Sequence, residues 1–172
     1  EQQLYDCLVT VMNHRAVASP ESGRSTSPPL ITRYTLAESK ANVDLRILLA
    51  EDNLINQKVA VRLFQRLGHR IDVVANGREA VEALTRLRYD MVFMDCQMPE
   101  MDGFEATQLI RADGKPYSKM PIIALTANAM SGDREQCIAA GMDDYLPKPV
   151  KPAELTAILL KWAGGLETDK AA

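Results

Sequence analysis

Apolar and polar positions become regular from residue 45 onward, where short apolar runs alternate with amphipathic segments. Runs that are apolar throughout are typical of parallel strands buried on both faces. Apolar residues that recur every three to four positions predict helices. The predicted strands are 45–50, 70–75, 91–95, 120–127 and 144–148, and the predicted helices are 57–69, 78–88, 104–112, 133–141 and 152–165. The segment "EDNLINQ" predicts a polar loop after the first strand, and the pair Asn76–Gly77 predicts a turn after the second.

This alternation of strands and helices predicts a fold of the α/β class. Consecutive parallel strands need crossover connections, and right-handed crossovers place helices on both faces of the sheet. The number of strand–helix units is too small for an eight-stranded barrel. We therefore expect an open, doubly wound sheet of five parallel strands.

The beginning of the chain does not follow this pattern. Leu4, Leu8 and Val11 recur at helical spacing, which predicts a short amphipathic helix that needs a partner surface. The stretch "SPESGRSTSPP" that follows is rich in serine and proline and cannot form a core, which predicts a flexible linker. The expected organisation is a helix over 1–15, a linker over 16–44, a domain over 45–164 and a polar tail over 165–172.

Composition and charge narrow the classes of partner. The net charge of −3 gives no reason to expect a nucleic-acid partner, because nucleic-acid-binding surfaces are usually basic. No apolar run approaches the roughly 20 residues that span a bilayer, so we expect this part of the chain not to enter a membrane. We expect it in the cytoplasm, which is compatible with a longer parent chain anchored in the inner membrane. Three cysteines without metal-ligand spacing, Cys7, Cys96 and Cys137, are expected to be reduced thiols.

Polar side chains that can do chemistry stand at the ends of the predicted strands. Glu51 and Asp52 follow the first strand, Asp95 ends the third, Thr126 ends the fourth, and Lys148 ends the fifth. In open parallel sheets, functional sites form at the carboxyl ends of the strands. We therefore expect three carboxylates to converge beside one hydroxyl and one ammonium group.

The convergence of these groups favours phosphoryl transfer. Crowded carboxylates repel one another, and a hard divalent cation such as Mg²⁺ relieves that repulsion. A lysine supplies a positive charge for a phosphoryl group, and an aspartate can itself be the nucleophile that forms an acyl phosphate. A single acid at a strand end often only caps the next helix, but five such residues at four strand ends favour a shared site.

Residues 45–164 resemble the receiver domain of response regulators in two-component signalling. The resemblance rests on the motifs "ILLAEDNLINQ", "MVFMDCQMPEMDGFEA", "IIALTANA" and "AAGMDDYLPKPV", in this order and spacing. It implies a flavodoxin-like sheet with strand order 2-1-3-4-5. It also implies a cis peptide bond between Lys148 and Pro149.

The resemblance implies a role for each acid. Asp95 corresponds to the phosphate-accepting aspartate. Asp52 would bind Mg²⁺ directly, with Mn²⁺ as an alternative, and Glu51 would bind it through water. The backbone carbonyl of Gln97 would be a third ligand from the protein.

The same resemblance implies how the phosphoryl group is bound and sensed. Lys148 would pair with the phosphoryl group, and the main-chain N–H groups of Cys96 and Ala127 would reach its oxygens. Thr126 would move to form a hydrogen bond to it. Tyr145 would be the aromatic switch that is coupled to Thr126.

The motifs are most similar to receivers attached to hybrid sensor histidine kinases. The expected partners are a histidine kinase core and a histidine phosphotransfer domain. They would dock on the helix over 56–67, with Val59, Leu63 and Phe64 as candidate contacts, and on the loop after the fifth strand. The amphipathic segment over 1–15 resembles the closing helix of such a domain, so we interpret it as the remnant of a preceding module. The domain would phosphorylate and dephosphorylate itself, and its parent chain would be a transferase.

Other functions fit the sequence less well. A Mg²⁺-dependent phosphatase of the haloacid-dehalogenase type needs a second acid two residues beyond the nucleophile, where this chain has Gln97. A flavin- or nucleotide-binding module needs a glycine-rich loop after the first strand, and "AEDNLINQ" contains no glycine. A receiver that serves only as a scaffold has no need of Asp95, Thr126 and Lys148. A stand-alone receiver that acts by protein–protein binding is a further alternative.

Overall fold

The computed structural model describes residues 44–127 and 131–166, with only the backbone described over 131–133 and 164–166. The chain divides into two units, Glu1–Asn42 and Val43–Ala172, and the described residues all belong to the second. The predicted helix over 1–15, most of the linker over 16–44, and the end of the polar tail therefore lie outside the described residues.

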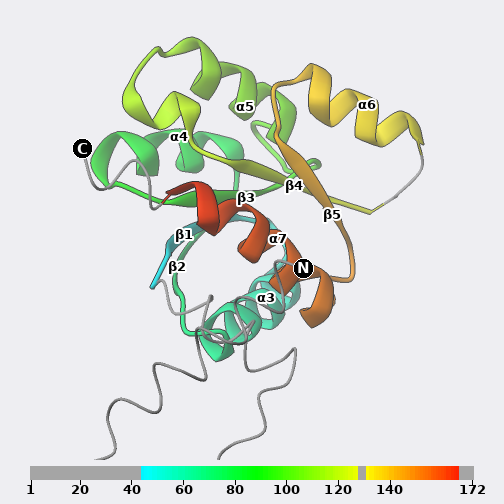
Figure 1. Cartoon of the computed structure of the whole chain (residues 1–172). Helices are drawn as coiled ribbons and strands as arrows, with labels where there is room; N and C mark the ends of the chain where they lie inside the picture. The colour runs from blue at the N-terminus through cyan, green and yellow to red at the C-terminus, as the bar shows by residue number, and fades with distance from the viewer. Residues whose placement is uncertain (1–43, 128–130, 167–172) are drawn as a thin grey trace, which may run out of the picture. The chain divides into compact units, whose positions relative to one another are not determined.

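Five strands form one parallel sheet in the order β2-β1-β3-β4-β5, which confirms the predicted fold class and strand order. Strands and helices alternate along the described chain, as the apolar pattern predicted (Figure 1). The elements are β1 (Arg46–Ala50), α3 (Leu54–Arg66), β2 (Arg70–Val74), α4 (Gly77–Arg86), β3 (Met91–Asp95), α5 (Gly103–Ala112), η1 (Pro116–Lys119), β4 (Ile122–Thr126), α6 (Ser131–Ala139), β5 (Asp144–Pro147) and α7 (Pro152–Leu166).

Burial follows the position of each strand in the sheet. Every residue of β3 and β4, which lie at the centre, is buried. The edge strand β2 contains exposed and partly exposed positions. Central strands covered on both faces need apolar side chains in both directions, which explains the continuous apolar runs.

Helices cover both faces of the sheet. Helices α3 and α7 pack on one face, and α4, α5 and α6 pack on the other (Figure 1). The first core contains Phe64 and Phe93, whose ring centroids lie 4.8 Å apart in an edge-to-face arrangement. The second contains Leu84, Met94 and Ile110. The sheet is therefore held from both sides, and its strand ends are fixed in position.

The helix boundaries differ from the predicted ones where asparagine caps a helix. Helix α3 begins at Leu54 rather than at residue 57, because the side chain of Asn53 accepts hydrogen bonds from the N–H groups of Ile55 and Asn56. The predicted turn at Asn76 is instead the cap of α4, since its side chain accepts from the N–H of Glu79. The short helix η1 was not predicted.

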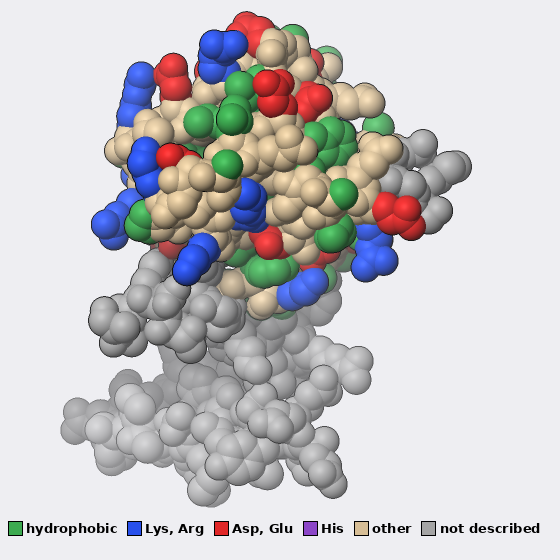
Figure 2. Space-filling model, turned by 90° about the horizontal axis from the view of Figure 1, so that it is seen from above, with side chains coloured by type: hydrophobic (Ala, Val, Ile, Leu, Met, Phe, Trp, Pro, Cys, Tyr) green, Lys and Arg blue, Asp and Glu red, His purple; other side chains and the backbone are tan. Residues whose placement is uncertain are grey.

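The surface seen from the side of α4, α5 and α6 carries interspersed acidic and basic side chains (Figure 2). Hydrophobic side chains are scattered between them on this face. Within the described part of the chain, none of the helices combines the length and the apolar character that crossing a bilayer requires.

Candidate functional site

The carboxyl ends of the parallel strands bring the predicted residues together. We call this side of the sheet the carboxyl edge. Glu51 directly follows β1, Asp95 ends β3, Thr126 ends β4, and Lys148 directly follows β5. A cleft of about 510 Å³ opens here, lined by Asp95, Cys96, Gln97, Phe104, Thr126, Ala127, Gln136 and Lys148. Phe104 and Gln136 were not predicted as site residues, because each lies on a helix rather than at a strand end.

Lys148 joins two of the acids. Its ammonium nitrogen lies 2.6 Å from Asp95 Oδ2 and 2.7 Å from Glu51 Oε2. Burial lowers the pKa of Lys148, but the hydrogen bonds to Asp95 and Glu51 outweigh burial and leave the pKa raised. The backbone N–H of Lys148 donates to the carbonyl of Thr126 at 2.7 Å, which fixes the start of the loop after β5. The Lys148–Pro149 peptide bond is cis, as predicted.

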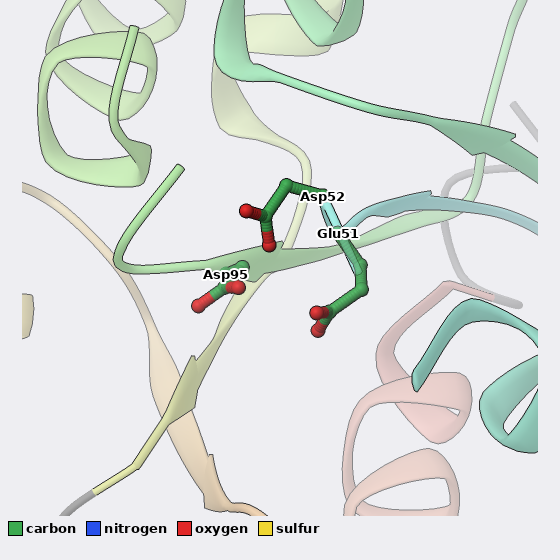
Figure 3. A group of neighbouring side chains, drawn as sticks. All are labelled: Glu51, Asp52 and Asp95. Carbon is green, nitrogen blue, oxygen red and sulfur yellow. The ribbon is translucent and has the colours of Figure 1, made fainter. Parts of the chain in front are cut away.

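Three carboxylates lie close together at the carboxyl edge. Oxygens of Glu51, Asp52 and Asp95 all lie within 4.8 Å of one another. The carboxylate of Asp52 turns toward that of Asp95, whereas Glu51 extends to another side (Figure 3). Asp52 is exposed, while Glu51 and Asp95 are 2% and 5% exposed. An all-oxygen set with one solvent-facing member fits Mg²⁺, which binds a few carboxylates and keeps several waters.

Burial governs the protonation of Asp95. It raises the pKa of the Asp95 carboxyl, and the hydrogen bonds from Lys148 and from the N–H of Gln97 offset only part of that rise. A positive charge beside Asp95 therefore favours its ionised form. The three carboxylates carry more negative charge than the single ammonium of Lys148 neutralises, and this excess favours the binding of a divalent cation.

The side chain of Glu51 is held by residues at the start of α3. Its Oε1 accepts a hydrogen bond of 2.8 Å from Asn56 Nδ2 and one of 3.3 Å from the N–H of Asn53. Gln57 Nε2 donates to the backbone carbonyl of Glu51 at 2.6 Å. Sequence reasoning missed Asn53 and Asn56, which hold the carboxylate. The available signal was the polar run "DNLINQ" directly after the acid pair, which was interpreted only as a loop.

The main-chain N–H of Cys96, which was expected to reach a phosphoryl oxygen, already has a partner in the protein. The N–H of Cys96 donates to the carbonyl of Leu125 at 3.1 Å and is occupied within the protein. The N–H that reaches the Asp95 carboxylate is that of Gln97, at 3.2 Å from Oδ1. Ala127 lines the cleft and is exposed.

Two glycines allow the loop after Asp95 to fold closely over the strand end. A Cβ atom on Gly103 would lie 2.1 Å from the carbonyl oxygen of Asp95, and one on Gly77 would lie 2.7 Å from that of Met101. The N–H of Gly77 donates to the same Met101 carbonyl at 3.0 Å. Any larger residue at Gly103 has to displace the backbone that carries Asp95.

The structure also places Tyr145 and two of the cysteines. Tyr145 is partly buried, pairs in register with Ala124 on β4, and lies with its ring centroid 6.0 Å from the Arg134 guanidinium. Cys96 and Cys137 are free thiols with their sulfurs 3.8 Å apart. Burial raises the pKa of the Cys96 thiol, which makes it a poor nucleophile.

The sequence of this chain is similar to those of known proteins. A family model described as the response regulator receiver domain matches residues 47–160. The chain is 43% identical over 126 residues to the hybrid signal transduction histidine kinase B of Dictyostelium discoideum, in an alignment that covers 67% of this chain and 6% of that protein. The chain spans between 6% and 23% of the length of the curated relatives it resembles.

This chain is also similar to receiver domains of known structure. The receiver domain of the sensor histidine kinase PA1611 from Pseudomonas aeruginosa PAO1, which has a magnesium ion coordinated in its active-site cleft, is 51% identical. It aligns with a TM-score of 0.66 and covers 71% of this chain and 99% of that one. The Ssk1 receiver domain of Saccharomyces cerevisiae, solved with the histidine phosphotransfer protein Ypd1, is 29% identical with a TM-score of 0.64, covering 69% and 88%.

Proposed function

Because this chain belongs to the family of response regulator receiver domains of two-component phosphorelays, we propose that Asp95 accepts a phosphoryl group from a phosphohistidine and passes it to a histidine phosphotransfer partner. The donor would be a histidine kinase core, and the parent chain would be a hybrid sensor histidine kinase. The single observation that carries this proposal is the position of Lys148 between two nearly buried carboxylates at the carboxyl edge.

The geometry supports a direct transfer. A carboxylate oxygen of Asp95 attacks the phosphorus as the P–N bond of the phosphohistidine breaks, and the departing imidazole nitrogen keeps the electron pair. Lys148 Nζ, 2.6 Å from Asp95 Oδ2, is placed to neutralise the oxygens of the incoming group. The N–H of Gln97 orients the other oxygen of the nucleophile. These residues position charge and need no further acid or base.

The proposed metal ligands are residues around Asp95. Asp52, Asp95 and the backbone carbonyl of Gln97 would hold Mg²⁺, with Mn²⁺ as an alternative. When bound, the ion would neutralise the negative charge that gathers as the phosphoryl group approaches. The exposure of Asp52 and the turn of its carboxylate toward Asp95 support this assignment (Figure 3).

We also propose that Thr126 and Tyr145 report the phosphorylated state. Thr126 is buried at the end of β4, on the wall of the same cleft as Asp95. Its hydroxyl would move toward the phosphoryl group, and the partly buried ring of Tyr145 would follow. The N–H of Ala127 would bind a phosphoryl oxygen.

Partner docking is proposed for the start of α3. Leu54, Ile55 and Val59 are 67%, 73% and 52% exposed, although they are apolar. An exposed apolar group beside a reaction site is a typical docking surface. Phe64, which was a candidate contact in the sequence, is 1% exposed and belongs to the core, so it is not part of this surface. Leu63 also packs against that core.

The test is phosphorylation by acetyl phosphate in the presence of Mg²⁺, followed by intact-mass measurement. The wild-type protein should gain the mass of one phosphoryl group, and Asp95→Asn should gain none. Asp113→Asn is the matched control, since Asp113 lies on the surface at the end of α5 and should be labelled like the wild type. Labelling of Asp95→Asn at the wild-type rate would contradict the proposal.

A further inference from the structure

Both oxygens of the Glu51 carboxylate have partners inside the protein. Oε1 accepts from Asn56 Nδ2 at 2.8 Å and from the N–H of Asn53 at 3.3 Å. Oε2 lies 2.7 Å from the ammonium of Lys148, and the residue is 2% exposed. A carboxylate with both oxygens bound inside the protein is suited to orient its neighbours.

We propose that Asn56 is a positioning residue for phosphoryl transfer, which fixes the Glu51 carboxylate so that Glu51 in turn holds Lys148 at Asp95. The inference rests on the function proposed above and deepens it. It assigns to Glu51 the role of a support for Lys148. The contacts form a continuous series of side chains from Asn56 through Glu51 and Lys148 to Asp95.

The chemistry of the side chains explains why such a support is needed. The terminal torsion of a glutamate is broad, so an unrestrained carboxylate samples many orientations. The lysine side chain is a flexible stem with a point charge at its end. The amide of Asn56 is a neutral donor, so it fixes Glu51 without adding a fourth negative charge to the acid cluster or a second cation that would compete with Lys148.

Two other roles for Asn56 make different predictions. Asn56 is exposed and lies between Ile55 and Val59 on the proposed docking surface, so it could serve only to bind a partner. In that case a small phosphodonor, which does not dock on α3, would react at the wild-type rate. It could also serve only to stabilise the helix. In that case alanine, which has the higher helix propensity, would be tolerated.

The experiment compares Asn56→Ala with a matched control, Gln57→Ala. Gln57 also links α3 to Glu51, but through the backbone carbonyl rather than the carboxylate. With acetyl phosphate and saturating Mg²⁺, Asn56→Ala should be phosphorylated on Asp95 about tenfold more slowly. This decrease corresponds to the loss of one hydrogen bond to a charged group. Gln57→Ala should stay within about twofold of the wild type, because its hydrogen bond does not orient the carboxylate.

A double-mutant cycle tests whether Asn56 acts through Glu51. In the Glu51→Ala background, Asn56→Ala should cause no further decrease in rate, since the side chain that it orients is gone. A tenfold decrease in both backgrounds would overturn the inference. Asn56→Asp, which keeps the shape but loses the donor, should be at least as slow as Asn56→Ala, and a wild-type rate for Asn56→Asp would also overturn it.

A spectroscopic measurement on the metal-free protein gives a readout independent of phosphorylation. The ammonium resonance of Lys148 should be observable by nitrogen-15 NMR in the wild type and in Gln57→Ala, because two carboxylates protect it from exchange. It should be broadened or shifted in Asn56→Ala. An unchanged resonance together with an unchanged rate would overturn the inference, whereas absence of labelling in the wild type would instead contradict the proposed function.

Discussion

At the amino edge of the sheet, where the strands begin, one guanidinium serves four acceptors, whereas at the carboxyl edge one ammonium pairs with two of three clustered carboxylates. Arg111 donates to the carbonyls of Gly141, Ser118 and Met120 at 2.7 to 2.8 Å and to Asp143 Oδ2 at 2.6 Å. The same Asp143 oxygen accepts from the N–H of Ile122 at 2.8 Å. Donors and acceptors there satisfy one another.

The carboxyl edge is organised differently. Glu51, Asp52 and Asp95 lie together, Lys148 pairs with Glu51 and Asp95, and the pKa of Asp95 is raised by burial. Charges that are balanced within the fold stabilise it, and an unbalanced cluster of one sign is ready for a ligand of the opposite sign. The comparison predicts that polar substitutions at the amino edge reduce stability and leave phosphorylation intact, while those at the carboxyl edge do the reverse.

The largest expected effect is that of Arg111→Ala. It leaves three carbonyls and a partly buried carboxylate without their donor, so we expect the free energy of unfolding to fall by about 3 kcal/mol. Urea denaturation measures this. Arg86→Ala is the control, because Arg86 is 74% exposed and its pair with Glu82 contributes no more than about 0.5 kcal/mol. Equal costs for the two variants would remove the distinction between structural and surface charges.

Gly103→Ala should lower the free energy of unfolding by about 2 kcal/mol and also slow phosphorylation of Asp95. The added Cβ would lie 2.1 Å from the Asp95 carbonyl oxygen, so the loop or the strand end has to move. Gly68→Ala is the matched control. Gly68 has φ +86 and no atom within 4 Å of an added Cβ, so it should cost about 1 kcal/mol and leave phosphorylation unchanged. A Gly103 variant with normal phosphorylation would show that the loop adapts.

The two edges also differ in how far their side-chain contacts could be predicted from the sequence. Asp95, Lys148 and Glu51 were predicted to meet because each stands at the end of an apolar run, and parallel strands place their ends on one side. Arg111 and Asn56 were missed, because their partners lie in other elements and no local pattern encodes a side chain's tertiary contacts. Asn76 was interpreted as a turn residue, since Asn-Gly is typical of turns and asparagine is also a preferred helix cap.

Asp144 is the first residue of β5, so the pH dependence of its contribution to stability tests the amino edge. Burial alone would raise the pKa of Asp144, but hydrogen bonds from Lys161, the N–H of Tyr145 and Trp162 outweigh it, so the pKa lies below its ordinary value of 3.8. The stabilisation is therefore fully present above pH 3.8 and is lost as the pH falls through the folded-state pKa. Asp144→Asn should cost about 1 kcal/mol at pH 7, allowing for screening by solvent.

The pH dependence is the sharper measurement for this residue. The difference in unfolding free energy between wild type and Asp144→Asn should be constant from neutral pH to about pH 4 and should shrink below it. Urea denaturation across this range measures the difference. A difference that grows on acidification would contradict the assigned direction of the pKa shift.

The smallest expected effect has the opposite sign and comes from the carboxyl edge. Asp52→Asn removes one of three mutually repelling carboxylates, so the metal-free variant should be slightly more stable than the wild type. Mg²⁺ at a concentration equal to its Kd should stabilise the wild type by about 0.4 kcal/mol, and the variant should lose this increment because it lacks a ligand. Thermal unfolding with and without Mg²⁺ measures both changes. If Asp52→Asn were destabilising without metal, the acid cluster would be balanced within the fold like the amino edge, and the contrast between the two edges would fail.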